Sequence, residues 1–110
     1  MKRVFLSSIL ILGLASGCAT SKPVALHDPT VVETACGECQ FGMKGHDCDL
    51  AVRIAGRAYF VDGVHIDSFG NAHSTNGLCN AVRQARVTGS IQRGRFVATQ
   101  FTLLPENGTH

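Results

Sequence analysis

Four cysteines in a short segment constrain the fold of this 110-residue chain more than any other feature. The segment runs from Thr30 to about Pro105, close to the smallest size at which a hydrophobic core alone stabilises a domain. Chains of this size commonly add disulfides or a bound metal ion. We therefore expect one small domain that is held together by its cysteines. These are Cys36, Cys39, Cys48 and Cys79.

The N-terminal segment has the parts of a bacterial export signal. Two basic residues precede a mostly apolar run at 4–14, and a small-residue cleavage site follows at 14–18. The apolar run is far shorter than the roughly 20 residues that a membrane-spanning helix needs. The segment resembles the lipobox of bacterial lipoproteins, in which the cysteine is lipidated and becomes the new N-terminus. We therefore predict a signal peptide at 1–17 and lipidation of Cys18.

The net charge of the mature chain and the residue after Cys18 indicate the partner class and the compartment. The chain has ten basic and eight acidic residues, and loss of Lys2 and Arg3 with the leader leaves eight of each. A neutral chain lacks the basic patch of nucleic-acid binding proteins, so we expect membrane contact through the lipid anchor instead. In the lipoproteins that the leader resembles, Ala19 after the cysteine directs the protein to the outer membrane. We expect it there, facing the periplasm, and the sequence identifies no protein partner.

The remaining chain divides into three parts. Residues 18–29 hold two of the three prolines and no apolar periodicity, which is typical of a tether. We assign residues 30–105 to the cysteine-rich domain and residues 106–110 to a disordered tail.

The spacing of apolar residues predicts a mainly β domain with one helix. Alternation at period two predicts strands and tight turns, and we expect the strands at 31–36, 50–55, 58–61, 87–91 and 95–104. Leu78, Ala81, Val82 and Ala85 have helical spacing, with a candidate N-cap at 74–76. This spacing predicts an amphipathic helix of about three turns, with Cys79 in its first turn.

The order β-β-β-α-β-β, with the helix between the third and fourth strands, is that of an OB-fold barrel. The stretch 87–99 resembles the final hairpin of many small bacterial OB-fold proteins. We therefore predict a small OB-fold-like barrel. The alternative is an open antiparallel α+β sheet with the helix on one face.

The spacing C-x2-C-x8-C-x30-C is compatible with three kinds of site. Two structural disulfides suit an oxidising compartment, and four cysteines allow three pairings. In a metal site, Cys36 and Cys39 form a knuckle, and Cys48, Cys79 or His73 completes a tetrahedron around zinc or copper. A redox dithiol is the third kind, although the glycines after Cys39 disfavour the long helix that begins at a thioredoxin dithiol.

Four runs of the sequence resemble an uncharacterised bacterial domain-of-unknown-function family of small exported cysteine-rich proteins. These runs are 36–45, 48–54, 58–63 and 77–81, together with Ala72 and His73. The resemblance spans about residues 34–104. It implies that the four cysteines and His73 form one constellation, and it implies no activity.

Common enzyme motifs are missing from the sequence, among them G-x-S-x-G, H-E-x-x-H and the P-loop. We therefore name no catalytic residue. We expect a non-enzymatic envelope lipoprotein whose cysteines either staple the domain by disulfides or bind zinc or copper. The alternative is a periplasmic thiol–disulfide redox protein.

Overall fold

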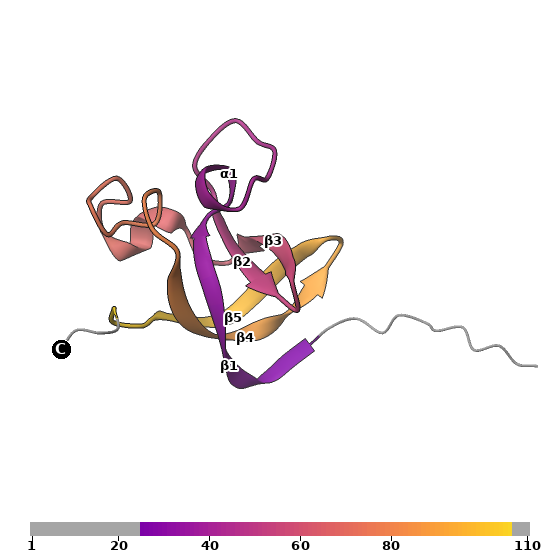
Figure 1. The fold of residues 1–110 in the computed structure, drawn as a ribbon. Coiled ribbons are helices and arrows are strands. Elements are labelled where there is room, and N and C mark those ends of the chain that lie inside the picture. The colour runs from indigo at the N-terminus through magenta and orange to yellow at the C-terminus, as the bar shows by residue number, and fades with distance from the viewer. Residues whose placement is uncertain (1–24, 107–110) are drawn as a thin grey trace, which may run out of the picture.

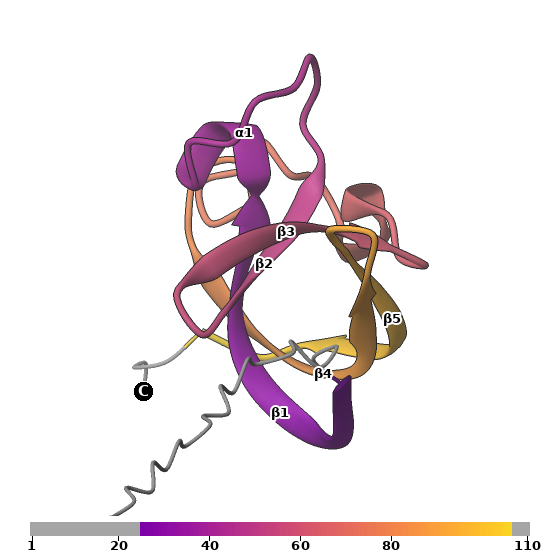
Figure 2. The ribbon, with the colours of Figure 1, turned by 90° about the vertical axis from the view of Figure 1, so that its right-hand side faces the viewer.

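A computed structural model of the protein describes residues 25–106, which form a closed five-stranded barrel (Figure 1). The strands are β1 (Ala25–Cys36), β2 (Leu50–Ile54), β3 (Arg57–Asp62), β4 (Arg83–Gln92) and β5 (Arg95–Leu103). Figure 2 shows them as a ring in the order β1-β2-β3-β5-β4. The predicted OB-fold-like barrel is confirmed, and its closure excludes the alternative of an open sheet.

The length of β1 makes closure possible. This strand pairs with β4 from Ala25↔Ser90 onward and with β2 as far as Cys36↔Leu50, so one strand serves two neighbours. A parallel pairing of β3 with β5, which includes Val61↔Phe96, closes the ring on the other side. The first strand takes up the last five residues of the segment that we assigned to the tether, and two of these, Ala25 and Leu26, pair with β4.

The barrel interior holds the hydrophobic core. Phe96, Val52 and Val87 are fully buried, and they come from β5, β2 and β4. The buried Thr34 hydroxyl donates a hydrogen bond of 2.8 Å to the carbonyl of Ala51, so this polar group keeps a partner inside the barrel.

The predicted helix over residues 78–85 is wrong. Residues 74–80 form turns, and β4 already begins at Arg83. The apolar spacing has two separate causes: Leu78 packs into the core from a turn, whereas Ala85 faces the interior from a strand and pairs with Val32. The Asn80 side chain stabilises the turn, because its amide donates to the carbonyls of His73 and Ser74.

Two short helical segments are present instead. The α-helix α1 (Gly37–Gln40) lies between β1 and β2, and the 3-10 helix η1 (Ile66–Phe69) lies between β3 and β4. The second occupies the place in the chain order where we expected the helix. Within residues 25–106, neither the length nor the hydropathy of any helix is sufficient to cross a membrane.

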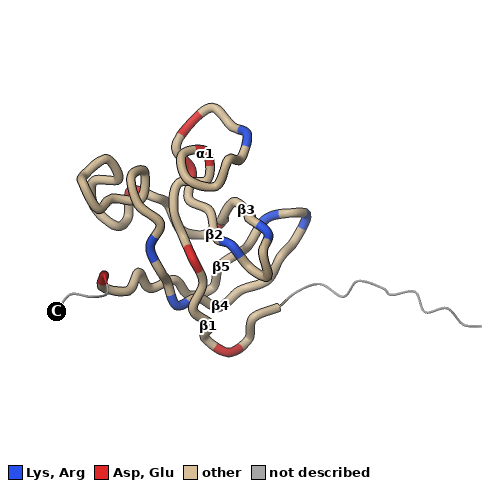
Figure 3. Tube along the Cα trace, viewed as in Figure 1, with Lys and Arg blue, Asp and Glu red and all other residues tan. Residues whose placement is uncertain are grey.

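Acidic and basic residues are interspersed over the barrel (Figure 3). Two ion pairs link neighbouring strands, one between Arg53 and Glu33 and one between Arg95 and Asp62. The predicted leader, the lipidation site Cys18 and residues 107–110 of the predicted tail lie outside the described residues.

Candidate metal centre

The structure brings the four cysteines of the domain together at one end of the barrel. Their Sγ atoms all lie within 4.8 Å of one another. Cys36 ends β1, Cys39 lies in α1, Cys48 directly precedes the segment that leads into β2, and Cys79 lies in the turns before β4. Residues that are far apart in the sequence therefore form a single cluster.

Backbone hydrogen bonds hold the three cysteine-bearing segments together. The N–H of Cys36 donates to the carbonyl of Leu78 at 2.9 Å, next to Cys79, and the N–H of Gly37 donates to the carbonyl of Asp49 at 2.8 Å, next to Cys48. The Gln40 side-chain amide donates to the carbonyl of Cys79 at 2.8 Å. Two main-chain bonds and one side-chain bond therefore join these segments in addition to the sulfur atoms.

The Cys36-Gly-Glu-Cys39 segment forms a tight knuckle. The backbone N–H of Cys39 donates to the Cys36 sulfur at 3.2 Å, and the two sulfur atoms lie 2.6 Å apart. A Cβ atom on Gly37 would lie 2.7 Å from the sulfur of Met43 and 2.8 Å from the ring of Phe60. A side chain at this position would force the neighbouring side chains to move, so glycine suits the close packing of the knuckle against the barrel.

The part of the chain that the structure describes contains one disulfide, between Cys48 and Cys79. Among the described residues, Cys36 and Cys39 are free, the first buried and the second exposed. The structure therefore contains one of the two disulfides in the disulfide interpretation. Cys79 lies in the turns before β4, and the prediction that it lies in the first turn of a helix is wrong.

Burial and hydrogen bonds together shift the pKa values of three groups in and beside the cluster. It raises the pKa of the Cys36 thiol to about 12, and the hydrogen bond with Cys39 adds to the rise. The pKa of Asp49 is raised mainly by its hydrogen bond with Glu38 and further by burial. For Glu38, burial acts to raise the pKa, but hydrogen bonds, chiefly from the backbone of Asp49, outweigh it and lower the pKa. Cys36 is therefore a neutral thiol at neutral pH unless a cation replaces its proton.

Glu38 is a cluster residue that our sequence analysis missed. Its Oε1 accepts the N–H of Asp49 at 2.9 Å and lies 3.7 Å from the Cys36 sulfur. Its Oε2 is buried and has no hydrogen-bond partner within the described residues. The signal available in the sequence was its place between the two cysteines of the knuckle.

His73 lies beside the cluster but is not part of the group of four donors. Its side chain is exposed, and it lines a hollow of about 310 Å³ together with Cys48, His65 and three aspartates. These are Asp47, Asp49 and Asp67. The hollow gives solvent and small cations a path to the Cys48 side of the cluster.

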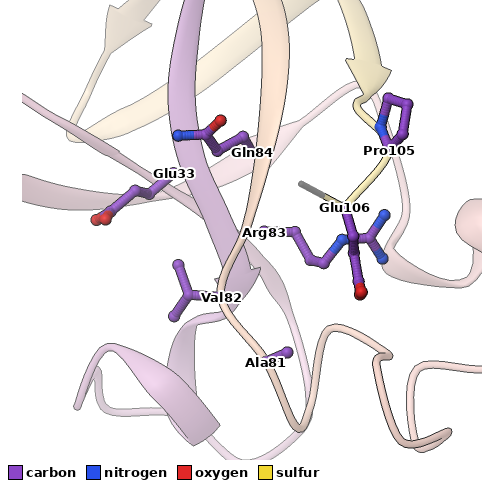
Figure 4. A pocket seen from close by; sticks show the side chains of 7 residues that line it. All are labelled: Glu33, Ala81, Val82, Arg83, Gln84, Pro105 and Glu106. Atoms are coloured by element: carbon purple, nitrogen blue, oxygen red, sulfur yellow. The ribbon is translucent and has the colours of Figure 1, made fainter. Parts of the chain in front are cut away.

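A larger hollow of about 440 Å³ contains no cysteine (Figure 4). Its lining includes Glu33 and Arg83, which already have partners: Glu33 is paired with Arg53, and the Arg83 guanidinium donates to the carbonyls of Asn76 and Leu104. Because these charged groups are engaged within the domain, the cysteine cluster is the better candidate for a functional site.

Comparison with known proteins finds similarity to one protein family. No curated protein and no solved structure is significantly similar to the chain. A family model matches residues 30–104, which include all four clustered cysteines. The expected membership in a domain-of-unknown-function family is confirmed, whereas export remains a prediction. The chain belongs to the family of unknown function DUF6370.

Proposed function

We propose that this protein is a non-enzymatic lipoprotein of the cell envelope whose four clustered cysteines bind a thiophilic metal ion, zinc or copper. The observation that carries the proposal is the mutual approach of four Sγ atoms within 4.8 Å. A tetrahedral zinc ion with Zn–S bonds of about 2.3 Å holds its sulfur ligands about 3.8 Å apart. The distance between the sulfurs of Cys39 and Cys48 is 3.8 Å. Small side-chain shifts would therefore complete a tetrahedron.

The donor set fits a soft ion. Thiolates favour zinc and copper(I), whereas magnesium and calcium require oxygen ligands. The N–H of Cys39 that points at the Cys36 sulfur would stabilise the thiolate form of this ligand. Four sulfurs can bind the ion without a histidine, so His73 would act at most from the rim.

Metal binding and the disulfide exclude each other. Coordination by four thiolates requires reduction of the bond between Cys48 and Cys79, because a sulfur in a disulfide is no longer a thiolate ligand. The disulfide would therefore staple the domain when no metal is bound, and the metal would staple it in the reduced protein. The disulfide interpretation and the metal interpretation of the cysteine spacing would thus describe two states of the same cluster.

The metal proposal can be tested on protein isolated from the periplasmic face without added reductant. Near-stoichiometric zinc or copper with four titratable thiols in the domain supports it. Absence of metal with two titratable thiols corresponds to the disulfide form. In that case the protein is reduced and titrated with each metal against a chromogenic chelator.

A pair of variants makes the titration specific. Cys39 is exposed, so Cys39→Ser is expected to fold, and removal of one of four ligands should lower zinc affinity by about a hundredfold or more. The control is His46→Ala, an exposed residue of the loop that follows α1, which lies outside the donor group. Equal affinities of Cys39→Ser and the parent for both metals would overturn the proposal.

The envelope part of the proposal rests on the leader and on Cys18. A Cys18→Ala form should incorporate no labelled palmitate and should lack a stable membrane anchor. Incorporation equal to that of the parent would show that the lipobox interpretation is wrong, and it would leave the metal proposal unaffected.

A further inference from the structure

The two free thiols of the knuckle lie directly beside the disulfide. We propose that the metal-free cluster is an internal disulfide relay, in which Cys39 attacks the Cys48–Cys79 bond and Cys36 then resolves the product. The relay would move one disulfide from a bond between two distant segments to a bond within the knuckle.

The distances define the order of the steps. The Cys39 sulfur lies 3.8 Å from the Cys48 sulfur, so these two atoms are in contact across the cluster. The Cys36 sulfur lies 2.6 Å from the Cys39 sulfur, and a disulfide bond measures about 2.05 Å. Cys39 therefore lies next to the disulfide and Cys36 lies next to Cys39, so that rotation of these side chains would bring each sulfur into line for its attack.

In the first step the thiolate of Cys39 attacks the Cys48 sulfur. The Cys39–Cys48 bond forms and the Cys48–Cys79 bond breaks, and the electron pair leaves on Cys79, which takes up the proton that Cys39 gave up. In the second step the Cys36 sulfur attacks Cys39. The Cys36–Cys39 bond forms, the Cys39–Cys48 bond breaks, and the proton of Cys36 passes to Cys48.

Atoms and electrons balance without any other reagent. Both end states contain one disulfide and two thiols, and two electrons pass from the knuckle to the sulfurs of Cys48 and Cys79. Cys39 is exposed and Cys79 is 8% exposed. The relay thus connects the largely buried sulfur of Cys79 to the sulfur of Cys39, which an external thiol can reach.

The first test uses the unaltered domain, without a metal and in the presence of a chelator, so failure of the metal proposal does not affect it. The protein is treated at pH 8 with a slow alkylating agent in the absence of added thiol. A fixed disulfide confines the label to Cys36 and Cys39. The relay spreads the label to Cys48 and Cys79, while the total does not exceed two labels for each molecule. Contaminating reductant would raise this total, which separates it from the relay.

Trypsin makes the bonds easy to assign. Cleavage after Lys44 and Arg53 places Cys36 and Cys39 in one peptide, Cys48 in the next, and Cys79 in a third that ends at Arg83. Each pairing therefore gives a different mass after acid quenching. In Cys36→Ser the intermediate cannot be resolved, so a cross-link between the first two peptides, Cys39–Cys48, should accumulate. In Cys39→Ser the label should be lost completely from Cys48 and Cys79.

Two results would overturn the relay. One is label confined to Cys36 and Cys39 in the unaltered protein after prolonged reaction. The other is a Cys36→Ser variant that is folded, as judged by its far-ultraviolet circular dichroism, and contains only the Cys48–Cys79 bond. The first result is decisive even if the variants do not fold.

Discussion

Removing the disulfide between Cys48 and Cys79 should cost the metal-free domain a large part of its stability. The two cysteines are 31 positions apart in the sequence. In the chain-entropy model, a bond across a loop of this length stabilises the folded state by about 3.7 kcal/mol. A domain of about 80 residues has a total unfolding free energy of about 4–12 kcal/mol. The loss would therefore be a third of the stability or more.

Urea unfolding in the presence of a chelator measures this loss. The double variant Cys48→Ala/Cys79→Ala is compared with a Cys39→Ala reference, in which the exchange thiol is missing and the disulfide is fixed. Because Cys39 is exposed, the reference should lie within about 0.5 kcal/mol of the parent. A loss of about 3.7 kcal/mol corresponds to a fall in melting temperature of roughly 15–30 °C for a domain of this size.

Reduction of the reference protein by a phosphine is an independent measurement that leaves every side chain in place. It should give a loss similar to that of the double variant. If both perturbations cost less than about 1 kcal/mol while peptide mapping confirms the Cys48–Cys79 bond in the reference, the disulfide is not a staple, and the stability must come from the barrel core.

Three further outcomes are expected. The reduced, metal-free protein should lose stability as the pH rises from about 9 towards 12. The raised pKa keeps the proton on Cys36 in the folded state, whereas the unfolded chain releases it. An equal fall of the urea midpoint with pH in Cys36→Ala would refute this. His73→Ala should change unfolding free energy by less than about 0.5 kcal/mol and leave zinc affinity unchanged, and a tenfold loss of affinity would place His73 in the site. Gly89→Ala should cost about 1–3 kcal/mol, because its Cβ would collide with the Val97 carbonyl, and it should cost more than Gly94→Ala, which has the strain of a positive φ but no collision.

The strands could be predicted from the sequence because their pattern is local. Alternating residues such as Leu50, Val52 and Ile54 face the barrel interior together, and a period of two is visible without knowledge of the partner strand. The chain order of the strands then indicated the barrel, which needs β1 to pair on both sides.

The segment before β4 could not be predicted in this way. Leu78 and Ala85 are both buried, but one is held by a turn and the other by pairing with β1. Their spacing imitates a helix, although Gly77 and Asn80 have low helix propensity. What decides the conformation is the pairing of β4 with a strand about 50 residues earlier, which local spacing does not contain.

The cysteine cluster was predictable as a set but not in its bonding. Spacing identified Cys36 and Cys39 as a knuckle and offered Cys48, Cys79 or His73 to complete the site. The choice of the Cys48–Cys79 bond depends on how barrel closure places the turns after η1 beside the start of β2. Sequence alone leaves all three pairings open.

The early start of β1 sets the distance between the barrel and the bilayer, if Cys18 carries the lipid. Ala25 is already paired with β4, and only six residues lie between it and Cys18. The seven Cα–Cα steps from Cys18 to Ala25 span at most about 25 Å when the chain is fully extended. The barrel would therefore be confined to the layer next to the lipid headgroups. Molecules that exchange metal ions or thiols with it would have to reach the membrane surface, and long-range capture across the periplasm would be excluded.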